Sequence, residues 1–187
     1  MGKTAAAEII AQRGIRVIDT DALARQLVEP GQPALKEVVA AFGARVLDDR
    51  GQLHRGELAK AVFSQASARQ KLESILHPRI RQLWTTQVSA WRAEHQKVAL
   101  IVIPLLFETH AETELDATIC VACSAATQQA RLATRGWSSD QINQRIASQL
   151  PIAEKISRSN FVVWNEAALD VLAAQLDLVL QRYSESI

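Results

Sequence analysis

The sequence begins Met1-Gly2-Lys3-Thr4 and continues into an alanine-rich stretch, Ala5–Arg13, whose pattern predicts a helix. Gly2-Lys3-Thr4 matches the second half of the phosphate-binding loop G-x-x-x-x-G-K-[ST], which follows a buried strand and opens a helix. In such a loop the backbone N–H groups hold phosphates, the lysine reaches the β- and γ-phosphates, and the hydroxyl binds Mg²⁺. Because Gly-Lys-Thr alone is common by chance, the rest of the chain decides whether this assignment holds.

The first half of the loop, and the strand that would feed it, do not precede Gly2 in this sequence. In many folds with such a loop that strand lies in the middle of a sheet, and without it the neighbouring strands would expose unpaired N–H and C=O groups. We therefore expect Met1 to be an internal methionine and the native start to lie upstream.

Four short apolar runs alternate with helical patterns along the chain, and they are Ile15–Ile18, Val98–Ile103, Ala117–Ala122 and Phe161–Trp164. Runs that are apolar almost throughout are typical of strands covered on both faces, as in a parallel sheet. Because helices lie between them, the sequence predicts an α/β layer fold.

The longest helical region lies between the first two strands, from Ala22 to Gln96. It is too long for a simple crossover, so we expect an inserted helical subdomain. Its predicted breaks are Pro30–Pro33, Asp48–Gly51 and His77-Pro78. Within it, Trp84 and Trp91 lie seven residues apart, which places them on one helix face as packing residues.

An amphipathic helix is predicted at the C-terminus, where apolar residues recur every three or four positions. These residues are Leu169, Leu172, Ala173, Leu176, Val179, Leu180 and Tyr183.

The composition is that of one globular domain of ordinary size. Of the 187 residues, 48% are hydrophobic and 22% charged, and the net charge of +1 predicts no broad nucleic-acid-binding face. No apolar run reaches the length of a membrane span. The start lacks the apolar stretch of a signal peptide, because Glu8 and Gln12 follow closely. We expect a cytoplasmic protein.

Cys120 and Cys123 form a C-x-x-C pair. A zinc site needs about four ligands, and no second cysteine pair exists. A redox pair needs its first cysteine at a helix N-terminus, whereas Thr118–Ala122 reads as a buried strand. The pattern therefore favours two ordinary buried residues.

Asp19-Thr20-Asp21 follows the first predicted strand, at the position where ligands bind in open α/β sheets. Two carboxylates at this spacing fit Mg²⁺ coordination and general-base chemistry on a hydroxyl. Asp19 or Asp21 could equally cap the following helix. Both readings stay open, because one aspartate can cap while the other is catalytic.

Several motifs in register resemble the dephospho-coenzyme A kinases, a family of P-loop kinases. The resemblance covers essentially the whole chain. It rests on Val17–Gly31, Leu76–Ile80, Ile103–Glu108, Arg145–Pro151, Lys155 and Phe161–Asn165.

The resemblance implies transfer of the γ-phosphoryl group of ATP to the ribose 3′-hydroxyl of dephospho-CoA. On the donor side, Gly2, Lys3, Thr4 and Ala5 would bind ATP, with Lys3 on the β- and γ-phosphates and Thr4 on Mg²⁺. Asp21 would be the general base, and Asp19 would be a second residue on the metal side. Both aspartates would also contact the acceptor. Phosphoryl transfer depends mainly on such positioning and charge neutralisation.

Further residues acquire expected roles from the same resemblance. Arg131 and Arg135, spaced i, i+4 on one helix face, would close over the phosphates as part of a lid, with Arg135 catalytic and Arg145 a further lid-side candidate. A solvated basic face is the alternative for this pair. Asn165 would lie near the adenine of ATP. The remaining expected acceptor contacts are His77, Arg79, Leu105 and Glu108.

Gln149 and Lys155 also match the family pattern, but the sequence assigns them no role. Two positions depart from that pattern. Ser159-Asn160 stands where the family usually has Ala-Asp, and Glu166 stands where a glycine usually follows Asn165. These departures concern the adenine side of the expected site.

We thus expect one P-loop kinase domain over residues 1–187, with a helical acceptor-binding insertion at 22–96 and a lid at 125–150. The family sheet is mainly parallel and five-stranded, with helices on both faces. We expect a monomer or weak homo-oligomer without nucleic-acid or membrane partners. Two alternatives remain: a P-loop kinase for another nucleoside or nucleotide, and a non-catalytic CoA-binding protein, because the phosphate loop is truncated.

Overall fold

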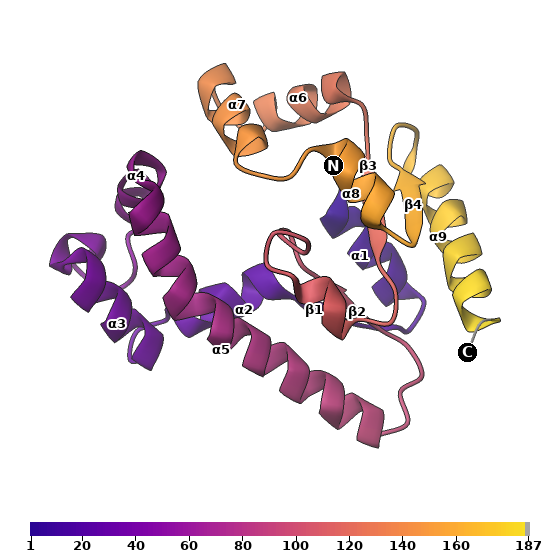
Figure 1. Cartoon of the computed structure of the whole chain (residues 1–187), viewed down its shortest axis with the longest axis horizontal. Coiled ribbons are helices and arrows are strands. Elements are labelled where there is room, and N and C mark those ends of the chain that lie inside the picture. Colours follow the sequence, from indigo (N-terminus) through magenta and orange to yellow (C-terminus); the bar gives the residue numbers. More distant parts are fainter. Residues whose placement is uncertain (186–187) are drawn as a thin grey trace. The chain divides into compact units, whose positions relative to one another are not determined.

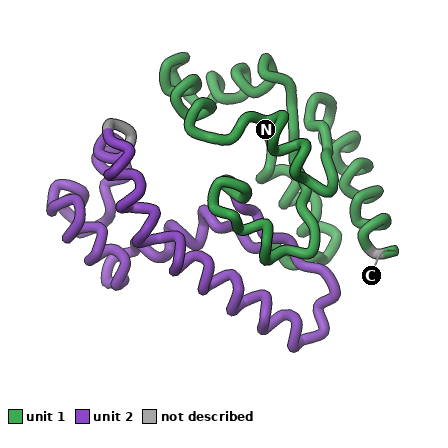
Figure 2. Tube along the Cα trace, in the orientation of Figure 1, with its two compact units in different colours: residues 1–17, 104–187 green, residues 18–103 purple. Residues whose placement is uncertain are grey.

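The computed structural model describes residues 1–185, apart from the side chains of Phe63, Ser64 and Ser184. The chain forms two compact units (Figure 2). Unit 1 consists of Met1–Val17 and Pro104–Ile187, and unit 2 consists of Ile18–Ile103. The second unit is therefore an insertion into the first.

Unit 1 is built around two parallel strands, β3 (Ile119–Ala122) and β4 (Phe161–Trp164), paired in register from Ile119 with Phe161 to Ala122 with Trp164. Parallel strands need a long connection, and here three helices supply it (Figure 1). They are α6 (Ala125–Ala133), α7 (Ser139–Ala147) and α8 (Ile152–Arg158). The remaining elements of unit 1 are α1 (Lys3–Gln12), the 3₁₀ turn η2 (Ala111–Glu114) and α9 (Leu169–Ser184).

The core of unit 1 forms where α9 packs against α1 and β4. Ile10, Val163, Leu172 and Leu176 are almost completely buried there. The predicted amphipathic C-terminal helix is confirmed from Leu172 onward, whereas Leu169, at the first turn of α9, is exposed. The apolar stripe thus starts one turn later than its spacing predicts, because the first turn projects beyond the core.

Unit 2 is mostly helical, as predicted for the region between the first two strands. Its two strands, β1 (Arg16–Asp19) and β2 (Ala99–Val102), pair with each other. The last two residues of β1 are the first two residues of unit 2. Between them lie α2 (Thr20–Leu27), α3 (Pro33–Phe42), η1 (Ala44–Val46), α4 (Arg55–Ser64) and α5 (Ala66–Ala93). The helices enclose one apolar cluster: Val28, Ala34, Leu35, Val38, Val46, Leu58 and Ile75.

The predicted break at His77-Pro78 is wrong, because α5 continues through Pro78. A proline inside a helix removes one backbone donor and costs roughly 3 kcal/mol. Ile75 and Trp84 are buried on either side of it, and α5 packs against α2, α3 and α4. This packing outweighs the local cost, and it also confirms the prediction that Trp84 is a packing residue.

The α/β class is confirmed, and each predicted apolar run overlaps a strand. The extent of the sheet differs from the expectation: the described residues form four strands in two two-stranded sheets, not one five-stranded sheet. The four apolar runs supply these four strands, and each strand pairs with one neighbour.

Strand β4 ends in a polar contact with α9. The backbone N–H of Trp164 donates to Oε1 of Gln175 over 2.8 Å, and Nε2 of Gln175 donates to the carbonyl oxygen of Trp164 over 2.9 Å. One side-chain amide thus satisfies both backbone groups of Trp164, whose own side chain is exposed.

Cys120 and Cys123 are buried free thiols, which confirms the reading of this pair as ordinary interior residues. Burial raises the pKa of the Cys120 thiol, so it carries its proton at neutral pH. Within residues 1–185, no helix has both the length and the apolar character to cross a membrane.

Candidate functional site

The predicted phosphate-binding residues lie at the first turn of α1. Gly2 is the N-cap, with φ of 101° and ψ of 21°, a left-handed conformation that glycine adopts without strain. A Cβ atom at Gly2 would overlap the amide group of Asn165, so a larger residue does not fit. The first helical bond runs from Ala6 N to Gly2 O, and the preceding N–H groups have no intrahelical acceptor. The N-terminus of α1 is therefore suited to bind an anion.

Asn165, at the end of β4, joins three elements of unit 1. Its Nδ2 donates to the carbonyl oxygen of Met1 over 3.1 Å, and its backbone N–H donates to Ala122 O, at the end of β3, over 2.8 Å. Its own carbonyl oxygen accepts from Nη1 of Arg131, on α6, over 2.9 Å. Asn165 is buried, and these bonds fix the start of α1 relative to α6.

Three predicted cations act on the start of α1. The pKa of the Met1 amino group is lowered, first by burial and then by the positive charges of Lys3, Arg131 and Arg135, although Cys123 opposes the shift. Contacts place two of these cations at this point: Lys3 is the first residue of α1, and Arg131 donates to Asn165, which itself bonds to Met1.

The two arginines do not share a helix face, contrary to the prediction. Helix α6 ends at Ala133, and Arg135 lies in the following turn, where its N–H donates to Leu132 O. Gly136, with φ of 79°, allows the chain to leave the helix there. Arg131 and Arg135 therefore approach Met1 from a helix and from a turn.

Glu166 replaces the expected glycine and holds the N-terminus of α6. Its carboxylate accepts from the backbone N–H of Ser124, and from Oγ1 of Thr127 over 2.6 Å. The Thr127 hydroxyl first, and then the Ser124 N–H, lower the pKa of Glu166. A negative charge at a helix N-terminus is favourable, which accounts for the departure from the family pattern.

Asn160, the second departure, joins the starts of β3 and β4. Its Oδ1 accepts from both the backbone N–H and Oγ1 of Thr118 over 2.9 Å, and its own N–H donates back to Thr118 Oγ1 over 3.1 Å. An amide oxygen accepts these bonds as a carboxylate oxygen would. The substitution of asparagine for aspartate therefore has a structural explanation.

The segment between α6 and α8 carries the rest of the predicted lid. Ser138 and Gln141 form a reciprocal capping box at the start of α7. The guanidinium group of Arg145 lies 3.9 Å from the centre of the Trp137 ring. These contacts fold residues 137–147 onto themselves.

Glu108 forms a polar cluster with the residues that follow α7, a contact that the sequence did not reveal. Its Oε1 lies 2.9 Å from Nζ of Lys155 and accepts from the backbone N–H of Leu150 over 2.9 Å. Nζ of Lys155 also donates to Oε1 of Gln149 over 3.2 Å. Only the shared family pattern of Glu108, Gln149 and Lys155 singled them out in the sequence, and their spacing of about forty residues does not predict a contact.

This cluster sets the ionisation of Glu108. Burial alone would raise its pKa, but the bonds from Lys155 and from the Leu150 N–H outweigh burial and lower it below the ordinary value of 4.5. Because the folded-state pKa is below the unfolded-state pKa, ionised Glu108 stabilises the fold fully above the unfolded-state value. This contribution is lost as the pH falls through the folded-state pKa.

We therefore expect the free energy of unfolding to fall more steeply below pH 4.5 in the native chain than in a Glu108→Gln variant. Urea denaturation at a series of values from about pH 3 to about pH 6 measures this difference. Two curves that remain parallel over this range would contradict the prediction.

The aspartates Asp19 and Asp21 lie in unit 2, at the end of β1 and the first turn of α2. Oδ1 of Asp19 accepts from the backbone N–H of Asp21 over 2.8 Å, so the capping interpretation is confirmed for Asp19. Thr20 between them is buried, and its hydroxyl donates to Val102 O, at the end of β2, over 3.0 Å. The side chain of Asp21 is exposed.

His77 and Arg79, the expected acceptor contacts of unit 2, lie on α5. Arg79 is paired with Glu37 of α3, with 2.6 Å between Nη2 and Oε1, and its Nη1 donates to Ile75 O. Arg79 thus links two helices of unit 2 in addition to any contact with a ligand. His77 is half-buried.

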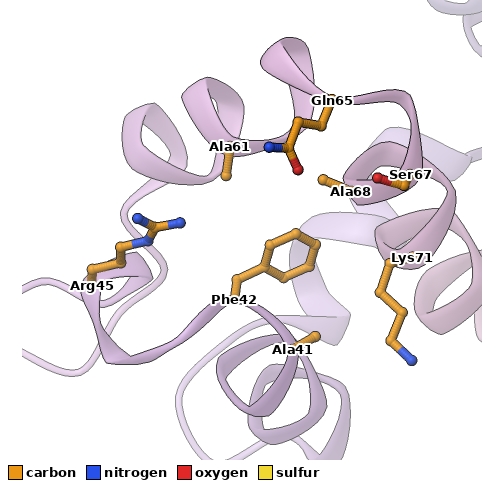
Figure 3. A pocket seen from close by; sticks show the side chains of 8 residues that line it. All are labelled: Ala41, Phe42, Arg45, Ala61, Gln65, Ser67, Ala68 and Lys71. Carbon is orange, nitrogen blue, oxygen red and sulfur yellow. The ribbon is translucent and has the colours of Figure 1, made fainter.

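A surface pocket of about 340 Å³ lies in unit 2, at the junction of α3, η1, α4 and α5. The side chains of Phe42 and Gln65 point into it (Figure 3). Its other lining residues are Ala41, Arg45, Ala61, Ser67, Ala68 and Lys71. None of the predicted site residues lines this pocket.

Comparison with known proteins places the chain beside one group of enzymes. A family model described as dephospho-CoA kinase matches residues 1–170. A dephospho-CoA kinase from Anaeromyxobacter dehalogenans is 40% identical over 180 residues, which cover 96% of this chain and 85% of that protein. A second, from Bdellovibrio bacteriovorus, is 37% identical over 98% of this chain and 92% of its own length.

Solved structures agree on the fold. A crystal structure of a Thermus thermophilus protein superposes with a TM-score of 0.79 at 30% identity, over 97% of this chain and 91% of that one. A dephospho-CoA kinase from Campylobacter jejuni gives a TM-score of 0.72 at 24% identity, over 99% and 92% of the two chains, and supports the same fold.

Proposed function

Because this chain belongs to the dephospho-CoA kinase family, we propose that it transfers the γ-phosphoryl group of ATP to the 3′-hydroxyl of dephospho-CoA, giving CoA. The observation that carries this proposal is the family match over residues 1–170, which includes both Gly2-Lys3-Thr4 and Asp19-Thr20-Asp21. The reaction class agrees with the helix N-terminus in unit 1 and with Arg131, which is held beside it through Asn165.

On the donor side, the first turn of α1 binds the phosphates of ATP through the backbone around Gly2, Thr4 and Ala5. Lys3 neutralises the β- and γ-phosphates, and Arg135 stabilises the charge that develops during transfer. Arg131 also contributes positive charge, while Asn165 lies on the adenine side. The position of Lys3 as the first residue of α1 and the bond of Arg131 to Asn165 support this arrangement.

Thr4 and Asp19 are the residues that would hold Mg²⁺. Within the described part of the chain, no cluster of three or more His, Cys, Asp or Glu side chains could hold a metal by itself. Mg²⁺ at phosphoryl-transfer sites needs only one or two protein oxygens, because water and the substrate phosphates complete its shell. A threonine hydroxyl at a helix N-terminus and an aspartate at a strand end match that donor set. Bound Mg²⁺ would neutralise charge on the phosphate oxygens.

On the acceptor side, Asp21 is the general base that takes the proton of the 3′-hydroxyl. Its exposed carboxylate follows β1, and its N–H is held by Asp19, which fixes the backbone at this point. The helical region at residues 22–96 would bind dephospho-CoA, with contacts from His77 and Arg79. The segment that follows β2 adds Leu105 and Glu108.

Residues 125–150 would form a lid that covers the phosphates and excludes water from the reaction. The cations Arg131 and Arg135 lie in this segment, as does Arg145. Residues 1–187 would act as one catalytic domain. We further propose a cytoplasmic monomer or weak homo-oligomer that does not bind nucleic acid.

The proposal is tested by incubating the chain with ATP, Mg²⁺ and dephospho-CoA and measuring CoA by chromatography. CoA formation that depends on all three components is the expected result. Turnover of AMP or a nucleoside at an equal or higher rate would favour another P-loop kinase. Calorimetric binding of dephospho-CoA without binding of ATP would identify a non-catalytic CoA-binding protein.

A further inference from the structure

Lys155 is a buried cation to which the proposed reaction gives no role. It lies on α8, and 8% of the residue is exposed. Lysine is rarely buried unless its charge is paired, because removing an ammonium group from water is costly. The reason for its burial must therefore be sought in what it contacts.

The contacts of Lys155 connect three separate segments of unit 1. Glu108 comes from the segment after β2, Gln149 and Leu150 come from the end of the predicted lid, and Lys155 comes from α8. A single oxygen, Oε1 of Glu108, receives both the Lys155 ammonium and the Leu150 N–H, each at 2.9 Å. The carboxylate of Glu108 and the ammonium of Lys155 together fix where the lid ends.

The stability of the fold alone does not require such a pair. A buried ion pair gains in attraction roughly what it loses in desolvation, and an apolar pair of similar size is often as stable. What distinguishes the ion pair from an apolar pair is its geometry, because the carboxylate accepts and the ammonium donates hydrogen bonds in defined directions. The pair therefore serves positioning better than stability.

The cluster is connected to the donor half of the site through β3. Helix α8, which carries Lys155, packs against β3, and Ala122 at the end of β3 accepts from the backbone N–H of Asn165. The side chain of Asn165 in turn donates to the carbonyl oxygen of Met1. A displacement at Lys155 would thus reach the phosphate-binding turn of α1 through these contacts.

We propose that Lys155 is a positioning residue for the phosphoryl transfer, because it holds Glu108 and Gln149 in place and so anchors the end of the lid at Leu150. This role rests on the proposed function. A lid needs a fixed point at each end. Asn165 and Glu166 hold its start through Arg131 and Ser124, and Glu108 with Lys155 holds its end.

The test uses the full chain with Lys155→Met, Lys155→Arg and the control Arg158→Met. Arg158 is a matched control, because it lies on the same helix, pairs with Glu112 rather than with Glu108, and lies over the Phe107 ring. Lys155→Met should lower kcat about 10- to 100-fold, the range expected when reacting groups are misplaced. The KM for ATP should stay within about threefold, because no proposed contact with ATP is removed.

Hydrogen exchange at the Leu150 amide provides a readout that needs no catalysis. Lys155→Met should speed this exchange by about tenfold or more, because the acceptor of that N–H is no longer held. Lys155→Arg should restore most of kcat and of the protection of Leu150, and Arg158→Met should change neither. A loss of melting temperature in Lys155→Met with unchanged kcat and unchanged exchange would overturn the proposal, since Lys155 would then be merely structural.

If Lys155→Met does not fold, the double variant Glu108→Gln/Lys155→Met removes both charges and keeps an amide oxygen that can accept from the Leu150 N–H. Faster exchange at Leu150 in this variant supports the anchor, and unchanged exchange overturns it. If the native chain forms no CoA, the proposed function fails, and the exchange at Leu150 alone decides whether the anchor exists.

Discussion

Replacing Asp21 by asparagine is expected to slow CoA formation by about 10²- to 10⁴-fold, the usual contribution of a general base. Asparagine has the same shape but cannot accept the proton of the 3′-hydroxyl. The N–H of residue 21 still donates to Asp19, so the start of α2 remains in place. The loss should therefore appear in kcat, with a small change in the KM for dephospho-CoA.

The matched control is Asp170→Asn, which makes the same chemical change at an exposed position in the first turn of α9, outside the proposed site. Steady-state rates of the two variants and of the native chain, measured at saturating ATP, give the comparison. A rate for Asp21→Asn within a few-fold of the native rate would remove Asp21 from the role of base.

The second large effect is expected from Lys3→Met, which should lower kcat by about 10²- to 10³-fold, as does the loss of one preorganised charge stabiliser in other active sites. Lys3 is the first residue of α1 and follows the left-handed N-cap Gly2. Methionine preserves the length of the side chain and the helix but removes the charge that would neutralise the β- and γ-phosphates. ATP binding, measured by calorimetry, should weaken at the same time.

Lys97→Met serves as the control, because Lys97 is an exposed lysine in the connection between α5 and β2. It should leave both kcat and ATP affinity unchanged. If Lys3→Met binds ATP and turns over like this control, then the phosphate-binding role of the first turn of α1 is wrong.

The predictions from sequence succeeded where a local pattern determines the structure. Each apolar run overlaps a strand, and the helix predicted after Gly2-Lys3-Thr4 starts at Lys3. The alternation of buried positions in α9 follows from its spacing. These features depend on neighbours within a few residues, which the sequence displays directly.

Predictions failed where distant contacts decide the outcome. Pro78 should end a helix by local rules, yet packing on both sides carries α5 through it. Arg135 has helical spacing from Arg131, but α6 ends at Ala133, two residues before Arg135. The contact of Glu108 with Lys155 joins segments that are far apart in sequence, and periodicity holds no information about such a pair.

For the candidate site, motifs supply the predictions at the start of α1 and the end of β1, because phosphate chemistry restricts which residues can serve there. Motifs did not show that Asn165 fastens the start of α1 to α6, or that Glu166 caps α6. Supporting contacts of this kind depend on which side chains the fold brings together, so they became visible only in three dimensions.

The amide of Gln175 at Trp164 has a consequence for behaviour at high concentration. A strand end with free backbone groups invites pairing with a strand of another molecule, and an exposed tryptophan would add to that attraction. Gln175 already occupies the N–H and the carbonyl oxygen of Trp164, so an incoming strand finds no partner there. The side chain of Gln175 on α9 thus protects the exposed end of β4 from pairing with a strand of another molecule.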